Sequence, residues 1–131
     1  MVLVSSKNVL RPGAEFGAYS ASKAGAHQLC KVAALELAPH DIRVNSVTPD
    51  AVFSEDEVKS GLWSEIGPSR AKAKGIDVDA LQSHYVVQNL LQVEISGRDV
   101  GRGVVFFCTR QTPTTGATLP IDGGVPGAFP R

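Results

Sequence analysis

A strand, a helix and a second strand follow one another near the amino end, and this order most restricts the fold. Residues 1–5 (MVLVS) are a short apolar run rich in β-branched residues, as in a buried parallel strand. Residues 18–38 have helical composition, and Pro39 marks their end. Residues 42–48 alternate apolar with polar side chains and stop at Pro49. This order predicts a right-handed βαβ unit with two parallel strands.

The later part of the chain predicts a third strand and a helical excursion. The last strand candidate is 117–121 (ATLPI), and residues 54–95 contain short helical segments that we expect to cover a site. The residues expected to interrupt these segments are Gly61, Gly67, Pro68 and Gly75. The predicted fold class is α/β, a partial Rossmann-like, doubly wound parallel sheet of about three strands with flanking helices. Residues 1–131 are expected to form a single domain.

The long predicted helix, 18–38, is expected to bury one face. Four apolar residues share that face at helical spacing: Leu29, Val32, Ala33 and Leu37. The same helix is also where a homo-oligomer would form.

Composition narrows the range of partners. The chain has 13 basic and 13 acidic residues and a formal net charge of zero, which argues against nucleic acid as a partner. The longest dense apolar run, VVFFC at 104–108, is too short to cross a bilayer, and the amino end lacks the pattern of a secretion signal. We therefore expect a cytoplasmic protein with a small-molecule substrate and no membrane partner.

The cysteine and histidine residues suggest no special chemistry. Cys30 and Cys108 lack a CxxC spacing and are expected to be reduced, buried thiols. The three histidines have no metal-ligand spacing, so no metal site is predicted: His27, His40 and His84.

Tyr19 and Lys23 are four residues apart in the predicted helix and therefore project from one face. A phenol ordinarily keeps its proton up to about pH 10, and a nearby ammonium group stabilises the phenolate. Ser6 follows the first strand, at the edge where open α/β sheets bind ligands. Together they suit the transfer of a proton to or from a carbinol oxygen. YxxxK alone is common and usually marks a helix surface, so the interpretation depends on the rest of the chain.

Four features in order along the chain resemble the carboxyl-terminal half of the short-chain dehydrogenase/reductases. They are Ser6, the YxxxK of Tyr19 and Lys23, the strand IRVNSVTP at 42–49, and TGATLPIDGG near the end. The resemblance implies that Tyr19 is the general acid/base and that Ser6 orients the substrate oxygen. It also implies that Lys23 promotes the phenolate and holds the nicotinamide ribose.

The same resemblance implies an NAD or NADP site built from Tyr19 and Lys23 and from four residues of the segment after the second strand: Pro49, Asp50, Val52 and Ser54. The backbone of Val52 would face the nicotinamide carboxamide, and Ser54 stands where relatives often carry threonine. Asp50 replaces the usual glycine of the family. It either changes substrate preference or points into solvent.

Two further segments, PDAVFS and DGGVPGAFPR, narrow the resemblance. They are similar to the dehydrogenase part of bifunctional rhamnulose-1-phosphate aldolase/short-chain dehydrogenases, which are associated with oxidising lactaldehyde to lactate. This resemblance implies rhamnose catabolism and a small, lactaldehyde-like alcohol or aldehyde as substrate.

The family's glycine-rich phosphate loop and catalytic asparagine would precede Ser6. We therefore expect a truncated domain that lacks the amino-terminal nucleotide-binding half, binds the cofactor weakly and is inactive by itself. The alternative is a non-catalytic fragment or pseudoenzyme that acts only by association.

A second glycine-rich segment, SGRDVGRG, imitates the missing loop through Gly97, Gly101 and Gly103, with Asp122 further on. It lies where the family's last helix begins, and Ser96 and Asp99 have capping-box spacing. We therefore expect a helix at 97–109 instead of a phosphate loop.

Overall fold

The sheet consists of three parallel strands in a computed structural model that describes residues 1–109 and 111–129. The strand order is β1 (Val2–Val4), β2 (Asn45–Pro49) and β3 (Thr118–Ile121). Val2 pairs with Asn45, and Ser46 pairs with Thr118. All three predicted strands are confirmed. β2 begins later than predicted, because Val44 donates its N–H to the Thr115 hydroxyl.

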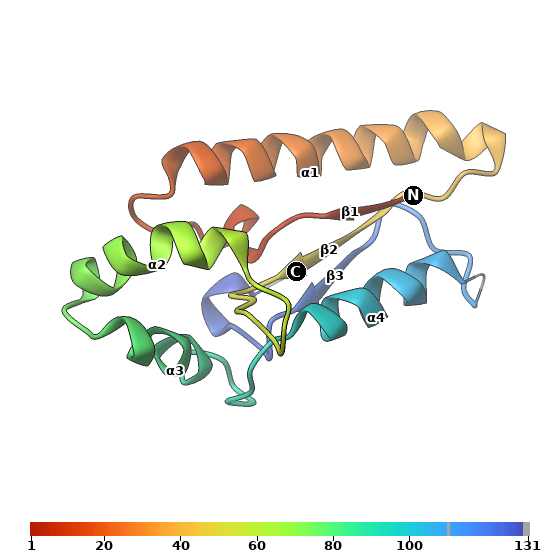
Figure 1. Ribbon diagram of the computed structural model, residues 1–131. Coiled ribbons are helices and arrows are strands. Elements are labelled where there is room, and N and C mark those ends of the chain that lie inside the picture. The colour runs from red at the N-terminus through yellow and green to blue at the C-terminus, as the bar shows by residue number, and fades with distance from the viewer. Residues whose placement is uncertain (110, 130–131) are drawn as a thin grey trace.

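Helices cover both faces of the sheet, with α1 (Gly17–Leu37) on one face and α4 (Gly97–Cys108) on the other (Figure 1). Every residue of β2 is consequently buried. Two of its polar side chains form hydrogen bonds: Asn45 Nδ2 donates to Thr114 O at 2.9 Å, and the Ser46 and Thr118 hydroxyls are 3.0 Å apart. The alternation in the sequence thus reflects buried polar side chains with partners.

The predicted helix 18–38 is confirmed as α1, but the predicted burial is wrong for two of the four residues. Ala33 and Leu37 pack against the core, whereas Leu29 is 69% exposed and Val32 is exposed as well. The buried residues of α1 are His27, Cys30 and Ala34. The small side chains of Cys30 and Ala34 pack against the core, whereas Leu29 and Val32 face outward.

The predicted helix at 97–109 is confirmed over Gly97–Cys108 and forms no phosphate loop. The Ser96 side chain accepts the Asp99 N–H, and the Asp99 carboxylate accepts the Ser96 N–H, which completes the capping box. Gly103 is buried against the sheet, since a Cβ there would meet Ile121.

Cys30 is buried as predicted, but the prediction that Cys108 is buried is wrong. Its thiol is exposed, at the last residue of α4.

The excursion after β2 contains α2 (Gly61–Lys74) and α3 (Leu81–Val86). Gly75 ends α2 in a left-handed conformation (φ 67°), as predicted for a helix-terminating glycine. The prediction that Gly67 and Pro68 interrupt a helix is wrong, because α2 continues through both. Gly67 is buried against Leu81, so tertiary packing of α2 on α3 outweighs the low helix propensity of this pair. The short 3₁₀ helices are η1 (Lys7–Val9), η2 (Ala38–His40), η3 (Val78–Ala80) and η4 (Pro126–Ala128).

Arg43, just before β2, forms hydrogen bonds with the end of α4 and with the segment that leads to β3. Its guanidinium donates to four backbone carbonyls, at 3.1 Å to Phe107, 3.3 Å to Thr109 and Thr112, and 3.5 Å to Thr114. It thereby satisfies carbonyl groups that the last turn of α4 leaves without helical partners.

Candidate active site

A cavity of about 680 Å³ opens at the carboxyl ends of β1 and β2. Its walls come from the end of β1, the first turns of α1, the segment after β2, the α2–α3 excursion and the start of α4. Six of the seven predicted site residues line it: Ser6, Tyr19, Lys23, Pro49, Asp50 and Val52. The seventh, Ser54, is exposed and lies outside this lining; its hydroxyl accepts the Ser60 N–H at 2.9 Å.

Ser6 reaches the cavity because β1 ends just before it and η1 begins just after it. Its side chain is buried, and its Oγ accepts the Asn8 N–H at 3.2 Å as the N-cap of η1. This bond uses a lone pair of the oxygen and leaves the hydroxyl proton for donation. Ser6 is therefore held as a donor at the carboxyl end of β1.

Tyr19 and Lys23 are held on consecutive turns of α1. The Lys23 ammonium lies 5.7 Å from the centre of the Tyr19 ring and donates to Val4 O at 3.1 Å. The Phe16 ring lies 5.6 Å from the Tyr19 ring at a tilt of 60°. The lysine thus connects α1 to the end of β1 beside the phenol.

Asp50 faces the cavity and not the solvent. Its Oδ1 lies 3.5 Å from the Lys7 ammonium, and the two side chains are only 12% and 14% exposed. Burial raises the pKa of the Asp50 carboxyl above its usual range, while the Lys7 charge and the Ala51 N–H act against that shift. The sequence suggested no role for Lys7, although it directly follows Ser6.

The excursion contributes an aromatic wall that sequence analysis missed. The rings of Phe53 and Trp63 stack with centroids 4.5 Å apart and planes at 10°, and Tyr85 lies 5.1 Å from Trp63 at 58°. All three residues line the cavity. Their spacing in the sequence follows no strand or helix period, because they come from a loop and two separate helices.

Arg70 of α2 closes the side of the cavity next to α1. Its Nη1 donates to Ala14 O at 2.9 Å and to the Glu15 carboxylate at 3.2 Å. Its guanidinium carbon lies 4.3 Å from the centre of the Phe16 ring, and the side chain is 13% exposed. Because α2 is held in this way, the excursion covers the cavity.

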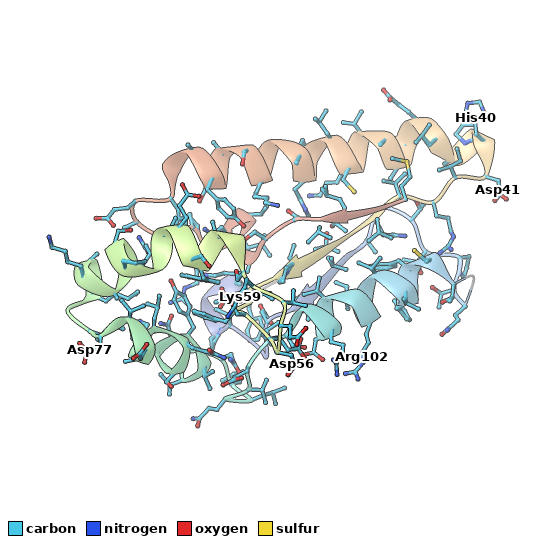
Figure 2. The ribbon with its side chains drawn as sticks, in the orientation of Figure 1. His40, Asp41, Asp56, Lys59, Asp77 and Arg102 are labelled. Atoms are coloured by element: carbon cyan, nitrogen blue, oxygen red, sulfur yellow. The ribbon has the colours of Figure 1, made fainter. Side chains whose placement is uncertain are left out.

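Charged residues of both signs lie where the segment after β2 meets the start of α4, and four of them line the cavity: Glu55, Asp56, Lys59 and Arg98. Asp56 and Lys59 lie on the segment between β2 and α2, and Arg102 lies on α4 (Figure 2). Arg98 forms ion pairs with Glu55 at 3.8 Å and Asp56 at 3.6 Å. A β-bridge pairs Val52 with Ile95, and the Val52 carbonyl accepts the Ser60 hydroxyl at 3.3 Å, so this part of the Val52 backbone is already hydrogen-bonded.

None of the three histidines lines the cavity. Within residues 1–109 and 111–129 no three His, Cys, Asp or Glu side chains are grouped as metal ligands. Burial lowers the pKa of His27 and of His84, in each case with a nearby lysine adding to the shift. His40 lies at the far end of α1 (Figure 2). No described helix has the length and apolarity that a membrane span requires.

A parallel Rossmann-like α/β fold with polar residues at the carboxyl ends of its strands defines a ligand-binding class of domain. A model of the short chain dehydrogenase family matches residues 1–64. The chain is similar over its whole length to YuxG of Bacillus subtilis strain 168, an uncharacterized oxidoreductase, at 40% identity over 132 residues. It is 34% identical over 125 residues to L-xylulose reductase of Bos taurus, which covers 95% of the chain.

A solved structure of a short chain dehydrogenase family protein from Francisella tularensis has the same fold. Its TM-score is 0.80 at 28% identity, over 95% of this chain and 49% of that one. The chain spans 19% of YuxG and 45% of the L-xylulose reductase. The likeness to these oxidoreductases therefore covers less than half of their length.

Proposed function

We propose that this chain is the catalytic, carboxyl-terminal part of a nicotinamide-dependent short-chain dehydrogenase/reductase. The observation that carries the proposal is that Ser6, Tyr19 and Lys23 line one cavity at the carboxyl edge of a parallel sheet. The family match over 1–64 contains all three residues. The reaction is the interconversion of a small alcohol and its carbonyl compound.

The cavity fits one end of the cofactor. Lys23 offers ammonium donors for a ribose, and Pro49, Ala51 and Val52 line the same cavity, where the family resemblance implies a nicotinamide ring. Within the described residues, Gly97–Gly103 belong to α4 and supply no phosphate loop. The residues thus fit the nicotinamide and its ribose but not the pyrophosphate, so we expect weak binding of NAD or NADP.

In the proposed mechanism a bound nicotinamide supplies the hydride acceptor or donor. Tyr19 takes the proton from the substrate hydroxyl during oxidation and returns it during reduction. Ser6, with its proton free to donate, holds the substrate oxygen beside the phenol. The Lys23 ammonium, 5.7 Å from the centre of the Tyr19 ring, places a positive charge beside the phenol. The proton of the reaction therefore moves between the substrate oxygen and the Tyr19 side chain.

The substrate is proposed to be small and lactaldehyde-like, in a cytoplasmic route of rhamnose breakdown, as the segments PDAVFS and DGGVPGAFPR imply. A hydrated aldehyde carries both a hydroxyl proton and a carbon-bound hydrogen, so the same groups can act on it. The relative that acts on L-xylulose supports a small hydroxylated substrate.

The test compares the chain alone with the chain co-expressed with the glycine-rich amino-terminal half of a short-chain dehydrogenase. NAD and NADP are titrated by calorimetry, and turnover of lactaldehyde and L-xylulose is measured. We expect weak binding and no turnover by the chain alone, turnover after complementation, and its loss in Tyr19→Phe. Turnover that survives Tyr19→Phe would contradict the catalytic assignment. Turnover by the chain alone would contradict only the expected inactivity.

A further inference from the structure

The cavity contains an ion pair, between Lys7 and Asp50, to which the proposed mechanism assigns no role. Lys7 follows Ser6 in the chain and Asp50 follows Pro49, so the pair lies at the carboxyl ends of β1 and β2. Both residues line the cavity that also contains Tyr19. The pair therefore lies close to the point where the substrate oxygen would bind.

The geometry of the pair leaves bonding capacity unused. The nitrogen–oxygen distance is 3.5 Å, whereas a strong charge-assisted hydrogen bond is about 2.7–2.9 Å long. Both side chains are largely removed from water, and an ion pair so placed often fails to offset its desolvation cost. An ammonium group has three donors and a carboxylate has about four lone-pair sites, of which Asp50 uses one for the Ala51 N–H and one for Lys7. A polar ligand group would complete this set.

Such a ligand group must both donate and accept hydrogen bonds. A hydroxyl does so, because it can donate to the Asp50 carboxylate and accept from the Lys7 ammonium at once. A carboxylate or phosphate would be repelled by Asp50, and an alkyl group would shield the pair from water without bonding to it. The pair thus favours a neutral group that both donates and accepts, and a hydroxyl is such a group.

We propose that Lys7 and Asp50 bind a second hydroxyl of the substrate, close to the carbinol that reacts at Ser6 and Tyr19. The substrate class is then vicinal diols and α-hydroxy carbonyl compounds, which include short sugars and polyols. The inference rests on the proposed function, because it takes Ser6 and Tyr19 as the reacting end of the cavity. The aromatic wall of Phe53, Trp63 and Tyr85 supplies an apolar surface for the carbon-bound hydrogens of such a molecule.

The test measures binding without any cofactor. The probes are 1,2-propanediol and 2-propanol, which differ by one hydroxyl. Trp63 is the sole tryptophan and lines the cavity, so its fluorescence reports occupancy, and amide shifts of Lys7, Asp50 and Ala51 in NMR spectra locate the ligand. We expect the diol to bind about tenfold more tightly or better in the wild type, as hydrogen bonds to charged groups allow.

Asp50→Asn and Lys7→Met should each reduce this preference to less than about threefold. Lys59→Met is the matched control: it removes a lysine from the same cavity wall outside the pair and should leave the preference unchanged. If a single variant fails to fold, the double variant Lys7→Met/Asp50→Leu replaces the buried pair with apolar groups of similar size, and it too should lose the preference.

Equal binding of the two probes by the wild type, or an unchanged preference in Lys7→Met and Asp50→Asn, would overturn the inference. These outcomes would leave the Tyr19→Phe result untouched, so the assignment of catalysis would survive. Loss of the diol preference in Lys59→Met to the same extent would also overturn it, since it would show a general effect of charge.

Discussion

The ammonium nitrogen of Lys23 lies 3.1 Å from the carbonyl oxygen of Val4, which joins α1 to the carboxyl end of β1. The same ammonium lies 5.7 Å from the centre of the Tyr19 ring. One side chain thus has a structural contact and a position beside the proposed acid/base. The two contributions can be separated by experiment.

Lys23→Met should reduce turnover of the complemented protein by about 100-fold or more, because general acid/base catalysis is worth 10²–10⁴-fold. It should lower the free energy of unfolding by no more than about 1 kcal/mol, because the bond to Val4 is exposed. Turnover assays and urea unfolding measure the two effects, and Lys31→Met, an exposed position on the same helix, is the control. Parallel losses of stability and activity would show that Lys23 has only a structural role.

Gly103 and Gly101 of α4 should respond to alanine in opposite ways. A Cβ at Gly103 would meet Ile121 Cδ1 and lie 3.4 Å from Val47 Cγ1, whereas a Cβ at Gly101 would meet nothing within 4 Å. Gly101→Ala should raise the free energy of unfolding by up to about 1 kcal/mol through helix propensity. Gly103→Ala should leave the protein about 1–3 kcal/mol less stable than Gly101→Ala, because it overpacks the contact of α4 with the sheet. Urea unfolding of both variants provides the comparison, and equal stabilities would contradict the close packing.

The capping box of α4 should make stability depend on pH. Hydrogen bonds from the Ser96 hydroxyl and backbone N–H lower the pKa of Asp99 below its ordinary value of 3.8. Because the folded pKa lies below the unfolded one, the stabilisation is present above pH 3.8 and is lost as pH falls through the folded value. At pH 7, Ser96→Ala should cost about 1 kcal/mol.

The stability deficit of Asp99→Asn relative to wild type should shrink as pH is lowered from 6 to 3. Urea unfolding at several pH values measures it. A deficit that stays constant over this range would mean that the charge of Asp99 contributes nothing to the cap.

Arg70 should protect the backbone amide hydrogens of α2 from exchange with solvent. Its contacts with Ala14, Glu15 and the Phe16 ring are contacts of α2 with the segment before α1. In Arg70→Ala the amide hydrogens of α2 should exchange at least about tenfold faster, as expected for the loss of roughly 1.4 kcal/mol of local stability. Lys72→Ala, exposed on the same helix, is the control and should exchange like the wild type. Unchanged exchange in Arg70→Ala would show that other contacts hold the excursion.

The outer side of α1 should mediate self-association. Leu29 and Leu35 are 69% and 78% exposed, and Val32 lies between them on the helix. The double variant Leu29→Gln/Leu35→Gln should lower the average mass measured by sedimentation, while urea unfolding at low concentration changes by less than about 0.5 kcal/mol. A sedimentation profile identical to that of the wild type would exclude this surface as an interface.

Local sequence patterns correctly predicted the helices, strands and caps whose structure depends mainly on residues close together in the chain. The apolar strands, the long helix before Pro39 and the Ser96–Asp99 cap all follow from short-range chemistry. Gly75 at the end of α2 is another case, since its left-handed backbone favours glycine.

The incorrect or missing predictions concern residues whose positions depend on tertiary packing. Periodicity placed Leu29 in the core, but the sheet accepts the small residues Cys30 and Ala34 and leaves Leu29 outside. The Lys7–Asp50 pair joins residues far apart in the chain, so no spacing rule predicts it. The same holds for Arg70, whose partners Ala14 and Glu15 lie 56 and 55 residues earlier in the chain.

Arg43 has a consequence for how the chain acquires its structure. Its carbonyl partners lie 64 to 71 residues later, and the Ser46–Thr118 hydroxyl pair on neighbouring strands spans 72 residues. Contacts of such long sequence separation carry a loop-closure cost before they return any stabilisation, and they slow folding. During synthesis, β2 remains without its β3 neighbour until Thr118–Ile121 have been translated. A nascent chain stalled before that point would expose β2, a strand that is fully buried in the folded protein.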